Sequence, residues 1–340
     1  MTTIKDVAKR AGVSVAAVSR AFNNYPDINA QTKAHILRVA EELRFYPRAS
    51  ARNLVTHQSK MIGVIYPAPD GVGLRHPFIG HLLNVFKDTI GDLGYDMMLL
   101  SDRTEPFDGW GIIDRIKHRG IDGVLLIGTP EEAVDELITL GIPMVGLDYV
   151  ATNPLMGSVT SENRRAVQEV VHVLYTNGYR KFGFLHGPMD ISVAMERLQG
   201  FYKGLRELDI PVRREWIAGG LFTLKAGQQA MSDVLATKEW PEVIIASADI
   251  CAIGAMQVLH SKGISIPDEM SLVGFDDIEA ASYVYPPLTT IAQNKEQIGQ
   301  MAAEILFTLM HSDARKDVPI HYVVPTKLVV RETTRKLQLP

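Results

Sequence analysis

The sequence predicts an all-α helix-turn-helix headpiece followed by an α/β core of two doubly wound lobes. Two observations support this fold class. Positive charge is concentrated in the first 60 residues, which contain 10 Lys and Arg against 4 Asp and Glu, whereas the other 280 contain 25 and 35. Beyond this basic segment, short apolar runs alternate with amphipathic helical patterns in two successive series. Such alternation is typical of α/β layers, and two series indicate two similar lobes.

The length of the chain indicates more than one domain. With 340 residues, it exceeds the roughly 250–300 residues at which a single core usually stops growing. We expect a DNA-binding domain over residues 1–46, a hinge helix and linker over 47–60, and a core over 61–340. The chain has neither a run of about 20 apolar residues nor the pattern of a signal peptide, so we expect a cytoplasmic protein without membrane contact.

Three helices are predicted in the headpiece. Apolar residues at helical spacing predict the first over residues 4–11 and the second over 15–22. Gly12 can adopt the left-handed conformation that ends the first helix, and Ser14 can cap the second. This short connection is typical of a helix-turn-helix. A third helix is expected over residues 30–45. Its expected buried residues are Ile36, Leu37, Val39, Ala40 and Leu43.

The basic headpiece suits a polyanion, and nucleic acid is the first candidate, because neutralised phosphates release counterions. A helical pair with polar exposed positions could also be a protein-interaction module. The next segment, residues 48–56, has helical character but too few apolar positions to fold alone. We therefore expect it to become ordered against a partner helix and DNA.

Four stretches of the headpiece carry a specific family pattern, at residues 3–8, 11–14, 18–20 and 46–54. With them the chain resembles the lactose-repressor/galactose-repressor family of bacterial transcription factors, over its full length. The resemblance implies a second helix in the major groove and a hinge helix that inserts a leucine into the minor groove. The residues that would contact DNA are Ser14, Val15, Ala16, Ser19, Arg20 and Leu54.

The chemistry of these residues agrees with such roles. Arg20 can donate two hydrogen bonds to guanine O6 and N7. Val15 and Ala16 can make only apolar contacts, for example with a thymine methyl group, and they could also be simple helix filler. Leu54 would be the wedge that kinks the duplex. The hydroxyl groups of Ser14 and Ser19 would bind phosphates. Such contacts position a protein without specifying sequence.

The core is predicted as strands that alternate with helices. The first series of strands lies at residues 62–65, 97–100, 123–127 and 144–147. The second lies at 182–185, 243–246 and 272–275. The helices between them fall near 77–93, 108–119, 131–140, 162–177, 192–208, 223–237 and 250–262. A late helix over 294–311 and a late strand over 322–330 follow.

Enzyme chemistry is disfavoured. The stretch that starts at Gly71 begins like a dinucleotide fingerprint but lacks the third glycine and a following helix. The chain has no P-loop, nucleophile elbow or His pair at metal-binding spacing. Cys251 alone makes neither an intramolecular disulfide nor a structural zinc site. We therefore expect no cofactor and no metal; a sugar-processing enzyme, the remaining alternative, would lack an acid/base pair.

Ligands of open α/β sheets bind at the carboxyl ends of the strands. Asp148, Asp249 and Asp276 each follow a predicted strand closely, although strand-end aspartates are often only helix caps. The family resemblance implies a fold like periplasmic sugar-binding proteins, with the ligand between the lobes. It also implies that Arg197 binds effector hydroxyls and that Phe222 lies against the ligand.

Three positions depart from the family pattern. His76 stands where an asparagine commonly precedes Pro-Phe, and it is included among the effector-binding candidates. Leu221 replaces a usual acidic residue, and Ala248 replaces a frequent asparagine. These departures concern the identity of the ligand. A sugar or sugar phosphate is the favoured effector; a purine corepressor and a phosphoprotein coregulator are the alternatives.

The resemblance further implies non-contiguous lobes joined by three strands. The N-lobe is expected at about 61–160 and 291–321, and the C-lobe at about 161–290 and 322–335. Such crossings let the lobes move as rigid bodies about a hinge. The expected assembly is a homodimer on a pseudo-palindromic double-stranded operator. The C-terminal residues 336–340 are too short for a heptad-repeat tetramerisation helix, so we expect a dimer.

Overall fold

The computed structural model describes residues 2–23, 25–45, 58–67, 73–101, 111–129, 131–149, 151, 153–311 and 319–338. Leu54 and most of the expected hinge segment lie outside these residues. The chain divides into two compact units. One contains residues 1–61 and 114–122, and the other contains residues 62–113 and 123–340.

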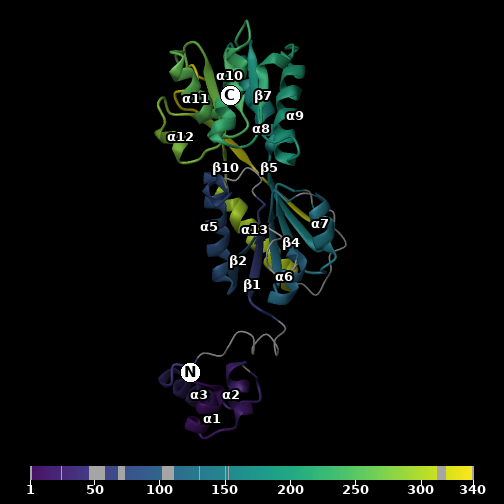
Figure 1. Ribbon diagram of the computed structural model, residues 1–340, viewed down its shortest axis with the longest axis vertical. Coiled ribbons are helices and arrows are strands. Elements are labelled where there is room, and N and C mark those ends of the chain that lie inside the picture. The colour runs from purple at the N-terminus through teal and green to yellow at the C-terminus, as the bar shows by residue number, and fades with distance from the viewer. Residues whose placement is uncertain are drawn as a thin grey trace. The chain divides into compact units, whose positions relative to one another are not determined.

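The headpiece consists of α1 (Ile4–Ala11), α2 (Val15–Phe22) and α3 (Ala30–Glu42) (Figure 1). Thr3 and Asp6 form a reciprocal capping box at the start of α1. Gly12 has a φ of 69° where α1 ends, and the Ser14 hydroxyl accepts a hydrogen bond from the Ala17 N–H at 3.1 Å. Both predicted signals of the turn are therefore confirmed.

The third helix is shorter than expected and buries a narrower stripe. It ends at Glu42 because Arg44 takes a left-handed φ of 49°, which the helix cannot continue. Leu37 was predicted to be buried but is 37% exposed. The reason is spacing, since the buried residues of α3 follow the i, i+3, i+4 rule and position 37 falls off that stripe. The buried core of the headpiece comprises Val7, Ala8, Ala11, Val18, Ala21, Ile36, Val39 and Ala40.

The core unit is built on two six-stranded sheets. The first has the strand order β11-β5-β4-β3-β1-β2 and the second has the order β12-β10-β9-β8-β6-β7. The strands of the first are β1 (Met61–Ile65), β2 (Asp96–Leu100), β3 (Gly123–Ile127), β4 (Met144–Leu147), β5 (Met156–Ser161) and β11 (Ile320–Val324). Those of the second are β6 (Phe182–His186), β7 (Ile217–Gly219), β8 (Val243–Ala246), β9 (Ser271–Asp276), β10 (Thr289–Gln293) and β12 (Thr326–Val329).

Helices cover both faces of the second sheet, with α8 and α9 on one side and α10 and α11 on the other (Figure 1). Their bounds are α8 (Asn163–Thr176), α9 (Ser192–Glu207), α10 (Leu224–Leu235), α11 (Asp249–Ser261) and the short α12 (Ala280–Tyr283). The remaining helices are α5 (Pro77–Asp92), α6 (Ile112–Arg119), α7 (Glu131–Ile138) and α13 (Lys295–His311). The two short 3₁₀ turns are η1 (Gly73–Arg75) and η2 (Arg214–Trp216). The predicted α/β class with two doubly wound lobes is confirmed.

The chain passes between the two sheets after β5, after β10 and between β11 and β12. The second and third crossings come a few residues later than the expected boundaries near 291 and 322. β10 belongs to the second sheet as far as Gln293, and β11 belongs to the first sheet as far as Val324. The late strand expected over 322–330 is in fact two strands, divided at Pro325, which has no N–H to continue a ladder. β12 pairs antiparallel with β10.

Close helix packing fixes the start of α11 beside the second sheet. A Cβ added at Gly227 on α10 would lie 2.2 Å from the Cys251 carbonyl oxygen. A Cβ at Gly254 on α11 would lie equally close, 2.2 Å, to the Leu224 carbonyl oxygen. Only glycine permits this approach, which holds the two helices together. Among the described helices, none is both long and apolar enough to cross a bilayer.

Candidate functional site

One face of α2 is left open by the packing of the headpiece. Val18 and Ala21 are buried against α1 and α3, whereas Val15, Ala16 and Arg20 are exposed. Val15, the first residue of α2, is 41% exposed although its side chain is apolar. The exposed side chains follow the i, i+1, i+4, i+5 spacing of a single helix face, together with the partly exposed Ser19.

Arg20 is held by an ion pair that leaves most of its donors available. Its Nη1 lies 3.0 Å from Asp27 Oδ2, and its side chain is 57% exposed. The edge formed by Nε and Nη2 remains suited to a bidentate contact with guanine. Ser14 uses its hydroxyl oxygen to cap α2, which leaves the O–H free to donate to a phosphate. The predicted wedge, Leu54, lies outside the described residues.

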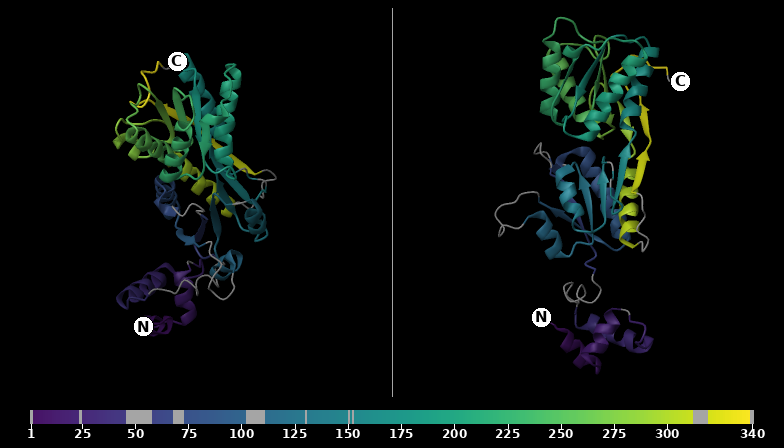
Figure 2. Two further views of the ribbon diagram at one scale, coloured as in Figure 1. Left: turned by 45° about the horizontal axis from the view of Figure 1, so that its top comes forward. Right: turned by 90° about the vertical axis from the view of Figure 1, so that its right-hand side faces the viewer.

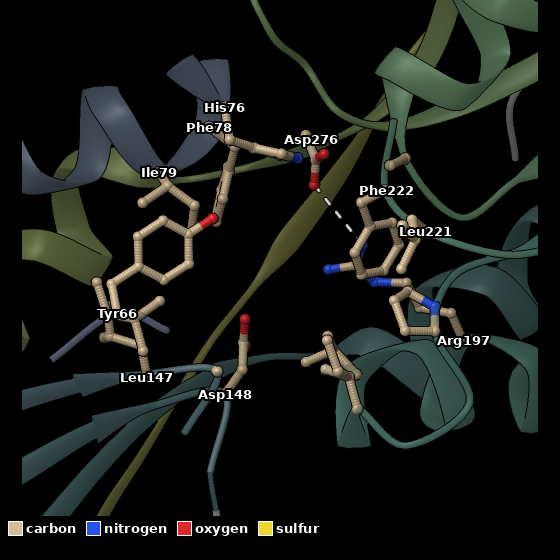
Figure 3. Close-up of a pocket in the computed structure, with 16 residues that line it drawn as sticks. Tyr66, His76, Phe78, Ile79, Leu147, Asp148, Arg197, Leu221, Phe222 and Asp276 are labelled. Carbon is tan, nitrogen blue, oxygen red and sulfur yellow. Dashed lines mark ion pairs between the residues drawn. The ribbon is translucent and has the colours of Figure 1, made fainter. Parts of the chain in front are cut away.

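A pocket of roughly 830 Å³, open solvent at its mouth included, lies in the core unit (Figure 3). Five of the six predicted effector residues line it: His76, Asp148, Arg197, Phe222 and Asp276. The tertiary structure thus brings together side chains from both lobes that are far apart in the sequence.

Arg197 is the centre of the polar wall. Its side chain is 4% exposed, its Nε donates to Asn163 Oδ1 at 2.8 Å, and its Nη1 donates to the Ser247 carbonyl at 2.6 Å. Nη1 also lies 3.7 Å from Asp276 Oδ1, the contact drawn in Figure 3. The guanidinium carbon stands 3.7 Å above the centre of the Phe275 ring. These contacts fix the orientation of the guanidinium before any ligand arrives.

Both pocket carboxylates sit on strained backbone. Asp148 has a φ of 56° and Asp276 a φ of 115°, conformations that residues with a Cβ rarely adopt. Strain of this kind persists where the surrounding structure imposes it, and it is common at binding sites. Burial raises the pKa of Asp276, and the nearby Arg197 and His76 oppose that rise.

Asp249 is the predicted effector residue that the structure does not bring into the pocket lining. Its Oδ1 accepts a hydrogen bond from the Thr290 hydroxyl, and its Oδ2 accepts one from the Ile278 N–H at 2.9 Å. The carboxylate is fully buried against β9 and β10. Asp249 therefore ties α11 to the end of the second sheet, a structural role that also satisfies the strand-end pattern.

Three helices begin at the pocket without a side-chain cap. Their N-cap residues are His76 of α5, Ile191 of α9 and Ala248 of α11, and all three line the cavity. Uncapped N-termini present backbone N–H donors and the positive end of a helix dipole. His76 is only 7% exposed, and its Nδ1 has no hydrogen-bond partner among the described residues. The pocket therefore offers donors as well as carboxylate acceptors to a ligand.

Apart from Phe222 and the position of Leu221, the apolar part of the wall was not predicted from the sequence. It is lined mainly by Tyr66, Phe78, Ile79, Ile127, Leu147, Pro188, Ile191, Val193 and Leu221. Tyr66 directly follows β1, as Asp148 directly follows β4. The strand-end rule would have found Tyr66 had it been applied to aromatic as well as to acidic residues. Ile191, the N-cap of α9, and Val193, on that helix, precede Arg197 and carried no separate signal.

Burial raises the pKa of Asp148 to about 6, although Arg197 and the Thr160 hydroxyl oppose the rise. Because its pKa is higher in the folded state, the Asp148 carboxyl binds a proton more tightly there than in the unfolded chain. The stability that this contributes is complete at pH values below the unfolded pKa, and it is lost as the pH rises through about 6. We therefore expect Asp148→Asn to stabilise the ligand-free protein at pH 8, by up to about 3 kcal/mol, and to leave it unchanged near pH 3. Thermal unfolding at both pH values measures this, with the exposed Asp92→Asn as control. A variant no more stable than wild type at pH 8 would contradict the expected effect.

A helix-turn-helix with one open face, in a chain that also carries a two-lobed α/β receptor with a polar pocket, defines the class of ligand-controlled DNA-binding regulators. Sequence comparisons agree with this class. Residues 3–48 match the lacI family of bacterial regulatory proteins, and residues 171–334 match the periplasmic binding protein-like domain. The chain is 31% identical to the HTH-type transcriptional repressor CytR of Escherichia coli, over 98% of this chain and 97% of that protein. The chain therefore belongs to the lacI family of bacterial regulatory proteins.

Two further comparisons agree. The HTH-type transcriptional repressor PurR of Mannheimia succiniciproducens is 29% identical, over 99% of this chain and 100% of that protein. The structure of the Lac repressor dimer bound to operator and the anti-inducer ONPF superposes with a TM-score of 0.85 at 24% identity, over 98% of this chain and 99% of that one. That likeness supports the fold. The chain is a DNA-binding transcriptional regulator under small-molecule control, in a family of repressors and not of enzymes.

Proposed function

We propose that this chain is a homodimeric repressor whose operator binding is controlled by a sugar in the core pocket. The observation that carries the proposal is the mixture of donors and acceptors around the cavity. Asp148 and Asp276 supply acceptors, and Arg197 with three uncapped helix N-termini supplies donors. A hydroxyl both donates and accepts, so a polyol can satisfy both kinds of group.

The charges of the lining favour an unphosphorylated sugar over a sugar phosphate. In the described lining, Arg197 is the one Lys or Arg side chain, and it already lies 3.7 Å from Asp276. A phosphate would bring up to two further negative charges next to two carboxylates, which is unfavourable in a partly buried site. The aromatic rings of Phe78 and Phe222 suit the apolar face of a sugar ring.

A purine corepressor is the second candidate. The same aromatic rings could stack on a flat base, and Tyr66 adds a third ring to this wall. Relatives that carry the name PurR match the chain over its full length. A purine base has N–H donors for the two carboxylates but no hydroxyl group that can both donate and accept, and for this reason we rank it second.

A thermal-shift screen with matched compounds tests the ligand class. Ribose and ribose 5-phosphate, glucose and glucose 6-phosphate, and hypoxanthine are each added to the full-length protein. A ligand that binds only the folded state raises the melting temperature, by an amount that grows with its concentration. We expect a rise with at least one free sugar and none with its phosphate. A larger rise with a phosphate ester or with hypoxanthine would overturn the sugar assignment.

The homodimer and its operator are tested with DNA selected from a random duplex library. A two-fold symmetric protein should select a pseudo-palindrome whose half-sites are spaced by whole turns of the duplex. Ligand control of this binding in a purified system would argue against a phosphoprotein coregulator. If control returned only when a cell extract was added, the coregulator would replace the sugar.

A further inference from the structure

Side chains at two of the three crossings between the lobes are hydrogen-bonded to each other. Ser161 ends β5 at the first crossing, and Gln293 ends β10 at the second. The Ser161 hydroxyl donates to Gln293 Oε1 at 2.7 Å. The third crossing is joined as well, because the Glu162 N–H donates to the Val324 carbonyl at 3.2 Å. Of these strands, β5 and β11 pair in parallel, and the right-hand view of Figure 2 shows the yellow strands near the C-terminus running from one lobe to the other.

The other end of Gln293 reaches the pocket wall. Its Nε2 donates to Asp276 Oδ1 at 2.7 Å, and the same oxygen faces the Arg197 guanidinium. An ionised carboxylate only accepts hydrogen bonds, which fixes the amide with its nitrogen toward Asp276 and its oxygen toward Ser161. Gln293 and Asp276 are each 3% exposed and Ser161 is 2% exposed, so these bonds are largely shielded from bulk water.

A second series of bonds returns from the pocket to the first crossing. Arg197 donates to Asn163 Oδ1, and Asn163 Nδ2 donates to the Ser161 carbonyl at 3.2 Å and lies 3.3 Å from Thr160 Oγ1. Thr160 Oγ1 in turn donates to Asp148 Oδ1 at 3.3 Å. Both pocket carboxylates are therefore connected to the last two residues of β5, Thr160 and Ser161.

A buried network of this kind has few acceptable arrangements. A rotation that separated Ser161 from Gln293 would leave a hydroxyl and an amide oxygen without partners in a site that excludes water. Such a network favours discrete lobe positions over a continuous range. A ligand group that competes for Asp276 acts directly on the bond that Gln293 makes with it.

We propose that Gln293 is a positioning residue that couples the occupancy of the pocket to the angle between the two lobes. It does so by holding the pocket residue Asp276 and the crossing residue Ser161 through the two ends of one amide. The inference rests on the proposed function in one respect, namely that the pocket is the effector site. It does not depend on which ligand binds there.

The test measures the distance between the lobes in the full-length protein without added ligand. Spin labels are attached at Glu136→Cys on α7 and Lys225→Cys on α10, both exposed positions. The native Cys251 is buried, and burial raises the pKa of its thiol to about 12, so it resists labelling. We expect Gln293→Leu to widen the distance distribution about twofold, because the lobes then move as rigid bodies without the tie.

Two further variants make the test decisive. Ser161→Ala removes only the hydroxyl donor and should widen the distribution less; it carries the test if Gln293→Leu does not fold. Gln297→Leu is the matched control, because this partly exposed glutamine on α13 bonds Tyr322 and not the pocket. The control is expected to keep the wild-type distribution.

A residue that only stabilised the fold would lower the melting temperature without widening the distribution of the folded molecules. Wild-type distributions in folded Gln293→Leu and Ser161→Ala proteins would overturn the proposal, as would an equal widening in Gln297→Leu. If no sugar raises the melting temperature while the widening is observed, the sugar assignment fails and the coupling role of Gln293 stands.

Discussion

Replacement of Arg20 by alanine is expected to weaken binding to a selected operator by about 10- to 100-fold per half-site, because a bidentate contact with guanine contributes about 1–3 kcal/mol. Affinity for unrelated duplex DNA should fall by less than about threefold, since it depends on phosphate contacts. The substitution should leave the fold unchanged, because Arg20 is 57% exposed and its ion pair with Asp27 joins two exposed side chains. Loss of such a pair contributes little to unfolding.

The matched control for this prediction is Arg10→Ala, which removes an exposed cation from the last turn of α1. It should weaken specific and non-specific binding to a similar extent and reduce the salt dependence of both. Titration of labelled operator and unrelated duplexes at two salt concentrations measures both affinities and the salt dependence of each. Equal losses on both kinds of DNA for Arg20→Ala would remove Arg20 from base recognition.

Arg197→Lys is expected to weaken binding of the effector at least about 100-fold, because one ammonium group cannot replace a guanidinium held by several partners. Lysine is preferred to alanine for this test. An alanine would leave the buried Asp276 without its cationic partner and Asn163 Oδ1 without its donor. Removing one member of a buried ion pair typically costs about 3–5 kcal/mol of stability. Lysine retains the charge, so the variant should fold. Without effector, its affinity for the operator should lie within about threefold of wild type.

Calorimetric titration with the sugar that gives the largest thermal shift measures the effect of Arg197→Lys. Arg206→Lys is the control, because Arg206 lies on the same helix, α9, but is exposed and does not line the pocket. Effector affinity within tenfold of wild type in the Arg197 variant would defeat the assignment of this residue. A loss that also appeared in the Arg206 variant would point to a general effect on α9.

Local patterns were sufficient to predict the headpiece. Gly12 and Ser14 identify a turn whose geometry depends only on neighbouring residues. The error at Leu37 arose because a helical stripe was drawn too wide, and its true width depends on how closely the other two helices approach. Local chemistry therefore fixes where helices begin, whereas burial at the margin of a helix depends on packing.

The pocket was only partly predictable. Asp148 and Asp276 were found because the ends of parallel strands meet at one edge of a sheet. Asp249 satisfied the same rule, yet its carboxylate bonds Thr290 and Ile278, partners that lie far along the chain. Strands β5 and β10 were missed as well, because their sequences contain Ser and Thr and do not form apolar runs. Their burial comes from neighbouring strands on both sides.

By itself the amino-acid sequence determined the class of fold, the turn of the headpiece and the polar residues at the strand ends. These features follow from side-chain periodicity and backbone preference within a few neighbouring residues. Only the tertiary structure decided which carboxylates face the cavity, that Arg197 is held before a ligand arrives, and that Gln293 links the pocket to a crossing between the lobes. The reason is that hydrogen bonds between residues more than a hundred positions apart, such as Ser161 and Gln293, depend on how the sheets are assembled.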